Sequence, residues 1–182
     1  MKKVSTFLTE GFETVEALAV IDILRRAGIA VDIISISDSL DVVSAQNIAV
    51  KAEFKLDGYD FSDTDMLFLP GGPGTKNYEK NESFLSIVKD FNHKDKSIAA
   101  ICAAPSVLGH LGILEGKKAT CFPGYEKDLY GAEVVSQKVV TDGKITTAIG
   151  MGASLELGFE IVRILLGEEM KEKIEKSTQF II

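Results

Sequence analysis

The sequence predicts a flavodoxin-like three-layer α/β/α sandwich with a mostly parallel central sheet. Short runs that are almost wholly apolar alternate with helical patterns in four rounds along the 182-residue chain. Such runs are typical of parallel strands that helices cover on both faces. No internal repeat, low-complexity tract or linker interrupts this pattern, so we expect a single domain over residues 1–182.

In the first half of the chain, the clearest helix follows the first strand. Val15, Leu18 and Ile23 recur at helical spacing, and Gly28 ends the segment. The β-branched residues after it predict a second strand, and two short apolar runs then predict a small hairpin. The expected elements are a strand at 4–8, a helix at 13–27, a strand at 29–36, the hairpin at 42–50 and a strand at 66–69.

In the second half, a polar helix is expected at 82–91, because Phe84 and Val88 lie on one face of it. A buried strand and a helix are expected within 98–114, and Asp142-Gly143 indicates a hairpin turn. The other expected elements are extended segments at 119–122, 133–135, 139–140 and 145–149, and helices at 154–166 and 168–176.

The composition excludes several classes of partner. The chain has 20 Lys plus Arg against 27 Asp plus Glu, a formal net charge of −7, and its basic residues form no cluster beyond adjacent pairs. We therefore expect neither nucleic acid nor an anionic membrane as a partner. Two cysteines far apart fit a reducing compartment, and glutamates soon after the first strand interrupt any signal-peptide core. A cytoplasmic protein is expected.

The strongest candidate for chemistry is Cys102, which directly follows an apolar strand. Ala100 and Ala104 stand two residues before and after it, and Pro105 suits the first turn of a helix. A nucleophile on a sharp strand-to-helix turn, a nucleophile elbow, needs small residues at those two positions. The helix that follows would direct free amides at the sulfur and lower the pKa of the thiol. The alternative is a buried, inert thiol.

No other residue is an obvious partner for this thiol. His93 lies in a charged segment, and His110 is eight residues beyond Cys102, about 12 Å along a helix. Cys121 stands at a strand end, where a packed thiol is the favoured interpretation. With two histidines and no paired Cys or His motif, we expect no metal site.

Two further strand ends carry candidate residues. Glu13 and Glu16 follow the first strand, where both can favour a helix N-terminus. Glu16 lies one turn deeper and can instead point over the sheet. A loop this acidic argues against a flavin or nucleotide, and we expect no cofactor. The segment Pro70–Gly74 either forms a turn without a ligand or lines an anion-binding nest. It is not a dinucleotide fingerprint, because Asn77 stands where the third glycine is needed.

Together these motifs resemble the ThiJ/PfpI superfamily. The matching segments occur in the family's order and span nearly the whole chain: Glu16, Leu69–Gly72, Ala99–Ala103 and Gly150–Ser154. The segment Arg25–Ile29 is similar to the Parkinson's-associated deglycase branch.

The resemblance implies a flavodoxin-like homodimer in which Cys102 is paired with a protonated Glu16. It also implies that the amides of Gly72 and Ala103, with Gly71 beside them, bind an oxyanion or the substrate. We expect the dimer interface to involve the first helix and the 42–50 hairpin.

The activity that the resemblance implies is that of a cysteine-dependent glyoxalase or deglycase. Cys102 would add to a small 2-oxoaldehyde or a glycated adduct, and Glu16 would move protons. One alternative is a redox sensor whose Cys102 is oxidised to sulfinate. Another is a chaperone-like stress protein without chemistry. The sequence does not separate the enzyme from the sensor, because both use the same residues.

Three positions depart from the family's pattern. Protease-like relatives have a histidine directly after the cysteine, where this chain has Ala103, so peptidase activity is not expected. The deglycase branch often has a histidine near the thiol, at a position that aligns with Phe122. Gln46 stands where a basic residue often reaches across the dimer.

Overall fold

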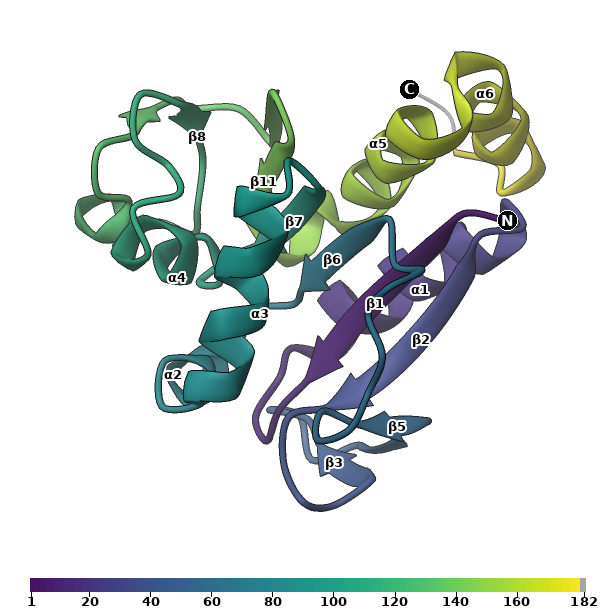
Figure 1. Cartoon of the computed structure of the whole chain (residues 1–182). Coiled ribbons are helices and arrows are strands. Elements are labelled where there is room, and N and C mark those ends of the chain that lie inside the picture. Colours follow the sequence, from purple (N-terminus) through teal and green to yellow (C-terminus); the bar gives the residue numbers. More distant parts are fainter. Residues whose placement is uncertain (181–182) are drawn as a thin grey trace.

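The computed structural model describes residues 1–180 and confirms the predicted three-layer fold (Figure 1). The strands of its central sheet are β1 (Lys3–Leu8), β2 (Ala30–Ser35), β5 (Phe54–Lys55), β6 (Met66–Leu69), β7 (Ser97–Ile101), β10 (Val139–Asp142) and β11 (Ile145–Ala148). They are ordered β10-β11-β7-β6-β1-β2-β5, and every neighbouring pair is parallel except β10 with β11. This order makes β1, β6 and β7 neighbours, so their carboxyl ends meet at one edge of the sheet.

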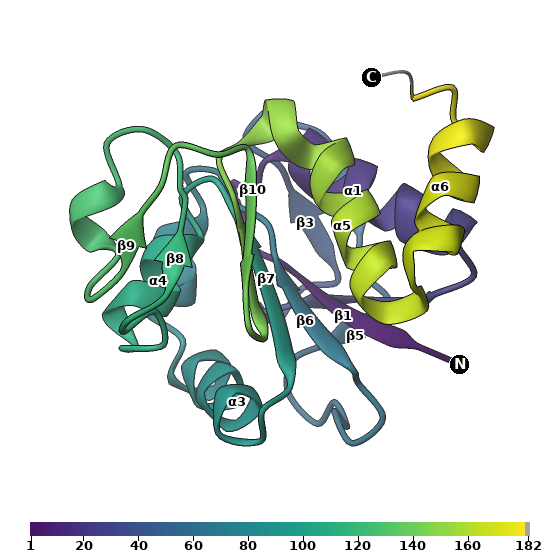
Figure 2. The same ribbon diagram turned by 90° about the horizontal axis from the view of Figure 1, so that it is seen from above.

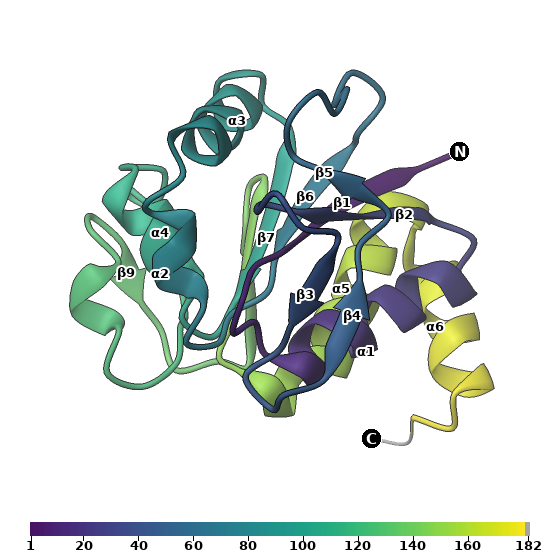
Figure 3. The ribbon, with the colours of Figure 1, turned by 90° about the horizontal axis from the view of Figure 1, so that it is seen from below.

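Helices cover both faces of the sheet (Figure 2). One face carries α1 (Thr14–Arg26), α5 (Ser154–Leu166) and α6 (Glu168–Ser177), and the other carries α2 (Thr75–Tyr78), α3 (Glu82–His93) and α4 (Pro105–His110), as Figure 3 shows. Each face has its own apolar core, because the side chains of each strand alternate between the two. In β1, for example, Val4 and Leu8 pack on the α1 side and Phe7 packs on the α3 side.

Two small sheets stand apart from the central one. They are the hairpin of β3 (Asp41–Val43) with β4 (Ala49–Lys51), and the parallel pair of β8 (Lys118–Ala119) with β9 (Glu133–Val134). The hairpin lies close to the start of α1 (Figure 3). Two backbone hydrogen bonds of 2.8 Å, from Gly11 N to Val43 O and from Ala45 N to Phe12 O, attach it to the loop after β1. Two short 3-10 helices, η1 (Glu126–Asp128) and η2 (Met151–Ala153), complete the described elements.

The structure differs from the sequence-based prediction in a few elements. The short helix α2 and the edge strand β5 were not predicted, since four and two residues are too few for a periodic pattern. The helix after Cys102 ends at His110 rather than near residue 114, because Gly112 takes a φ of +71° that no helix contains. The segment 119–122 is strand only at its first residue, which belongs to the small sheet of β8 and β9.

We predict that Thr6→Val raises the free energy of unfolding by about 1 kcal/mol. Thr6 is fully buried in β1, and its hydroxyl is without a hydrogen-bond partner within the part of the chain that the structure describes. Valine has nearly the same shape and no polar atom to desolvate. Urea unfolding measures the change. The matched control is Thr147→Val, because Thr147 Oγ1 accepts from Thr120 N at 2.9 Å. That variant should lose stability, and a loss in Thr6→Val would contradict the prediction.

Candidate active site

Cys102 occupies a sharp turn directly after β7. Its φ is +65°, a left-handed conformation that residues other than glycine rarely adopt. Cys102 N donates to Ala148 O at 2.9 Å, and Cys102 O accepts from Phe122 N at 2.8 Å, so the backbone is held on both sides. Ala100 and Ala104 are completely buried, which leaves no space for larger side chains. The geometry is that of the predicted nucleophile elbow.

Two backbone amides point at the sulfur of Cys102. They belong to Gly72 and Ala103, and their hydrogen bonds act to lower the pKa of the thiol. Gly72 has a φ of +98°, and a Cβ at this position would lie 2.6 Å from Glu13 N. Only glycine therefore brings this amide to the thiol without a clash. The family resemblance assigned these two amides to the binding of an oxyanion, and in the structure both lie at the sulfur of Cys102.

Glu16 reaches the same site from α1. The Glu13 carboxylate accepts from Glu16 N at 2.9 Å and caps the helix, which begins at Thr14. Glu16 then falls on the buried face of α1, where it is only 1% exposed. Its Oε2 accepts from Gly71 N at 3.0 Å, and its carboxyl group lies beside the Cys102 side chain, since a Cβ on Gly71 would be 2.7 Å from both Oε2 and Cys102 Cβ. Of the two roles that the sequence left open, Glu13 is the cap and Glu16 points over the sheet.

Gly71 allows the carboxyl group and the thiol to meet. A Cβ on Gly71 would lie 2.7 Å from Cys102 Cβ and 2.7 Å from Glu16 Oε2, so any side chain would push the two apart. The glycine segment after β6 also binds the loop after β1, since Gly71 O accepts from Glu13 N at 3.0 Å. The requirement for glycine here comes from close packing against Glu16 and Cys102 as well as from the exposed amides.

Burial raises the pKa of both acidic groups at the site. For Glu16 it raises the pKa from 4.5 to about 7, although the neighbouring Cys102 thiol and the Gly71 N–H act to lower it. For Cys102, burial and then the negative charge of Glu16 raise the pKa from 9.0 to about 12. The prediction of a lowered thiol pKa was therefore wrong, because these two effects outweigh the amides of Gly72 and Ala103. Near neutral pH the pair holds at most one negative charge, and the two groups titrate as a unit.

The other residues that the sequence singled out lie elsewhere. His110 pairs with Glu79 and Asp128 on the outside of α4. Cys121 is 4% exposed, and burial, followed by the charges of Glu126 and Asp128, raises its pKa to about 11. It is a packed thiol. Gln46 is exposed on the hairpin loop, and its Oε1 accepts from Thr14 Oγ1 at 2.7 Å.

Phe122 lies near the thiol, at the position that the family resemblance aligned with a histidine. Its backbone N–H donates to Cys102 O at 2.8 Å. A Cβ on Gly150 would stand 3.2 Å from Phe122 Cδ2 and 4.0 Å from Cys102 Sγ. The only sequence signal for this placement was the departure from the family's histidine.

Residues 1–180 contain neither a cluster of metal ligands nor a membrane-spanning helix. Their side chains include no group of three or more His, Cys, Asp or Glu placed to hold a metal ion. Over the same range, no helix has the length and apolar character needed to cross a membrane.

The sequence profile of the DJ-1/PfpI family matches residues 2–164. The chain belongs to this family. The resemblance to the ThiJ/PfpI superfamily that the motifs indicated is thus confirmed, and the fold agrees with that of solved family members. The oxidized DJ-1 of Toxoplasma gondii superposes with a TM-score of 0.94 at 29% sequence identity, and the match covers 98% of both chains.

Two curated relatives show the range of the family. Protein DJ-1 homolog B of Arabidopsis thaliana is 37% identical over 171 residues, which cover 92% of this chain. The chain spans only about two fifths of that relative's length, since the match covers 39% of it. A deglycase of Pyrococcus horikoshii is 33% identical over 140 residues, which cover 75% of this chain and 84% of the deglycase.

The raised pKa of Glu16 predicts a pH-dependent effect of Glu16→Gln on stability. A carboxyl group whose pKa rises on folding stabilises the fold fully below its unfolded pKa of 4.5, and this contribution is lost as the pH rises through about 7. Glutamine does not titrate. Between pH 4.5 and 7, Glu16→Gln should therefore gain stability over the wild type by on the order of 3 kcal/mol.

Urea unfolding of both proteins at several pH values in this range measures the gain. Glu172→Gln, which changes an exposed carboxyl group on α6, is the matched control and should differ from the wild type by a small amount that hardly changes with pH. A Glu16→Gln difference as independent of pH as that of the control would contradict the raised pKa.

Proposed function

We propose that the protein is a cysteine-dependent enzyme of the glyoxalase or deglycase type, acting on small 2-oxoaldehydes or glycated adducts. The observation that carries the proposal is the contact between the buried Glu16 carboxyl group and the partly exposed Cys102 thiol. The amides of Gly72 and Ala103 at the sulfur support it, because they suit a negative charge that develops there. The deglycase from Pyrococcus horikoshii is a relative whose name states such an activity.

The working form of the pair is a Cys102 thiolate beside a protonated Glu16, which forms when the thiol proton moves to the Glu16 carboxylate, the group that ionises first near neutral pH. Only one proton leaves the pair near neutral pH, because a second negative charge would face the first in a buried site. When the thiol proton moves to the carboxylate, the two amides stabilise the charge on the sulfur, and the carboxyl group can donate that proton again. A nucleophile and a general acid are thus present in the same state.

The proposed reaction begins when Cys102 Sγ attacks the aldehyde carbon. A C–S bond forms, and the carbonyl oxygen takes the proton of Glu16, which gives a hemithioacetal. The Glu16 carboxylate removes the hydrogen of that carbon as a proton, and a proton returns to the neighbouring carbon, while the hydroxyl proton of the hemithioacetal passes to the neighbouring carbonyl oxygen. Water then cleaves the resulting thioester and releases a 2-hydroxy acid. One carbon is oxidised and its neighbour is reduced, so the reaction needs water but no external oxidant or reductant.

A homodimer in the cytoplasm is the proposed setting. Val15 of α1, Met151 of η2 and Leu155 of α5 line a hollow of about 500 Å³, and each is more than 40% exposed. Exposed apolar side chains gathered in this way are typical of a contact between proteins. Ile48 of the β3–β4 hairpin is also exposed, as the expected interface requires. The free thiols of Cys102 and Cys121 fit a reducing compartment.

Light scattering at micromolar concentration should give about twice the chain mass of 19.7 kDa. Leu155→Asp should lower the measured mass toward one chain, because a carboxylate placed at an apolar contact has no partner there. Leu85→Asp, which changes a partly buried residue of α3 on the opposite face, is the control for general loss of stability. A wild-type mass of one chain would contradict the dimer.

Glu16→Gln should lower the turnover of methylglyoxal on the order of 10²-fold, because glutamine keeps a hydrogen bond but moves no proton. Cys102→Ser should remove the activity, and Cys121→Ser should leave it unchanged, since Cys121 is packed in the core. Formation of lactate measures the rate. Unchanged turnover in Glu16→Gln would remove Glu16 from the mechanism.

The second candidate function is a redox sensor in which Cys102 becomes a sulfinate. It is favoured by the same contact, because a protonated Glu16 can donate to a sulfinate oxygen. The DJ-1 of Toxoplasma gondii, which shares the fold, was solved in an oxidized form. A sensor needs no turnover, so its absence in the methylglyoxal assay would favour this candidate.

Peroxide should oxidise Cys102 before Cys121, because Cys102 is partly exposed and Cys121 is buried. The main product should be sulfinate rather than a disulfide between the two. Intact-mass measurement and peptide mapping across a peroxide titration distinguish these products. Earlier modification of Cys121, or a dominant disulfide, would contradict the assignment of Cys102 as the reactive thiol.

A further inference from the structure

The Phe122 ring is fixed at the mouth of the elbow. Phe122 N donates to Cys102 O at 2.8 Å, and Tyr125 N donates to Phe122 O at 3.1 Å, so the loop is attached to the elbow and closed on itself. The ring and the sulfur both border the space beside Gly150, since a Cβ on residue 150 would lie 3.2 Å from Phe122 Cδ2 and 4.0 Å from Cys102 Sγ. Glycine at position 150 leaves that space open.

Packing within the fold does not explain why an aromatic residue stands at position 122. It is 47% exposed, and it belongs to neither of the two apolar cores. Exposed ring surface beside a reactive group can instead cover an apolar part of a bound molecule. Such a contact between two rings contributes beyond the area that it buries.

The charges around the thiol favour a neutral molecule. The charged side chains with the largest effects on the two pKa values are carboxylates, Glu16 at Cys102 and Glu13 at Glu16. A substrate with its own carboxylate would be repelled by the negative charge of these groups. The chain as a whole is also acidic, with a net charge of −7.

We propose that Phe122 contacts the substituent of the substrate and makes the site selective for neutral 2-oxoaldehydes that carry an aryl or branched alkyl group. This inference rests on the proposed function. The reaction is unchanged: an aryl 2-oxoaldehyde and one water give one aryl 2-hydroxy acid, with Cys102 and Glu16 in the same roles. The ring of Phe122 holds the substituent while the aldehyde carbon faces the sulfur.

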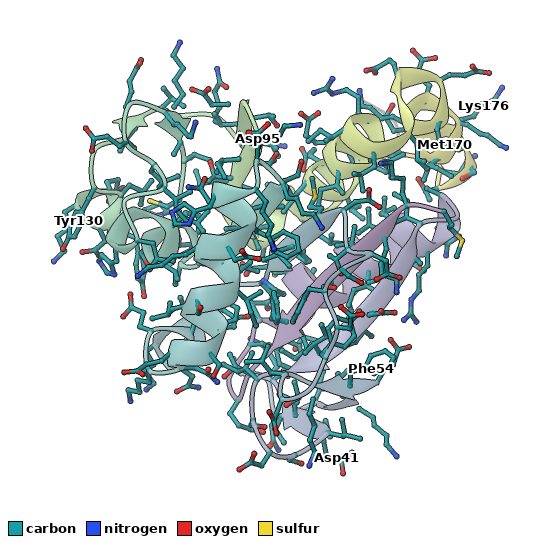
Figure 4. The ribbon with its side chains drawn as sticks, viewed as in Figure 1. Asp41, Phe54, Asp95, Tyr130, Met170 and Lys176 are labelled. Atoms are coloured by element: carbon teal, nitrogen blue, oxygen red, sulfur yellow. The ribbon has the colours of Figure 1, made fainter. Side chains whose placement is uncertain are left out.

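The test compares phenylglyoxal with methylglyoxal as substrates for the wild type, Phe122→Ala and Phe122→Leu. The ratio of the two kcat/KM values should fall roughly 3- to 10-fold in Phe122→Ala, mainly through KM for phenylglyoxal. Phe122→Leu should keep part of the preference because it keeps apolar surface. The matched control is Tyr130→Ala: Tyr130 is also exposed, packs against the His110 ring at a tilt of 50° and lies at the outer edge of the molecule (Figure 4). It should leave the ratio unchanged.

A second readout does not depend on turnover. Phenylglyoxal should protect Cys102 from iodoacetamide better than methylglyoxal does in the wild type, and this difference should shrink in Phe122→Ala. If the wild type shows neither turnover nor protection with either aldehyde, the proposed function itself is wrong. If the wild type turns both over and the ratio stays constant in Phe122→Ala, only the inference is wrong. A change of oligomeric state in Phe122→Ala would also contradict it, because the ring would then be an interface contact.

Discussion

The close contact among Glu16, Gly71 and Cys102 is the constraint on which the rest of the site depends. These residues come from α1, the turn after β6 and the turn after β7, and they meet because the sheet order makes β1, β6 and β7 neighbours. A Cβ on Gly71 would lie 2.7 Å from atoms of both other residues. The turn after β6 therefore has to contain glycine, and the first helix has to begin where Glu13 caps it, or the carboxyl group would not reach the thiol.

The same contact decides how charge is distributed at the site. A helix N-terminus and two amides act in favour of a thiolate, while burial and a neighbouring carboxylate act against it. The helix α4 has only six residues, so its dipole is small, and burial dominates at both acids. The outcome is a pair that keeps one proton near neutral pH, which is what proton transfer during a reaction requires.

Much of the fold could be predicted from the sequence, and parts of the site could not. The apolar runs at β1, β6 and β7 and the small residues around Cys102 are local patterns, so they appear in the sequence directly. Burial of Glu16 depends on the exact start of α1 and on Gly71, which is 55 residues away in the chain. The loop of Phe122 meets the elbow through a backbone hydrogen bond to Cys102, 20 residues earlier in the chain. Such contacts between distant segments leave no periodic signal.

The most direct test of this account is a carbon-13 NMR titration of the Glu16 carboxyl carbon and the Cys102 Cβ in the same protein. If the two acids form one buried unit, both signals should shift together in a single step near pH 7, with the second proton leaving only in strongly alkaline solution. Glu16→Gln and Cys102→Ser should each change the pH at which the remaining acid titrates. Independent titrations near the ordinary values of 4.5 for Glu16 and 9.0 for Cys102, unaffected by either substitution, would contradict it.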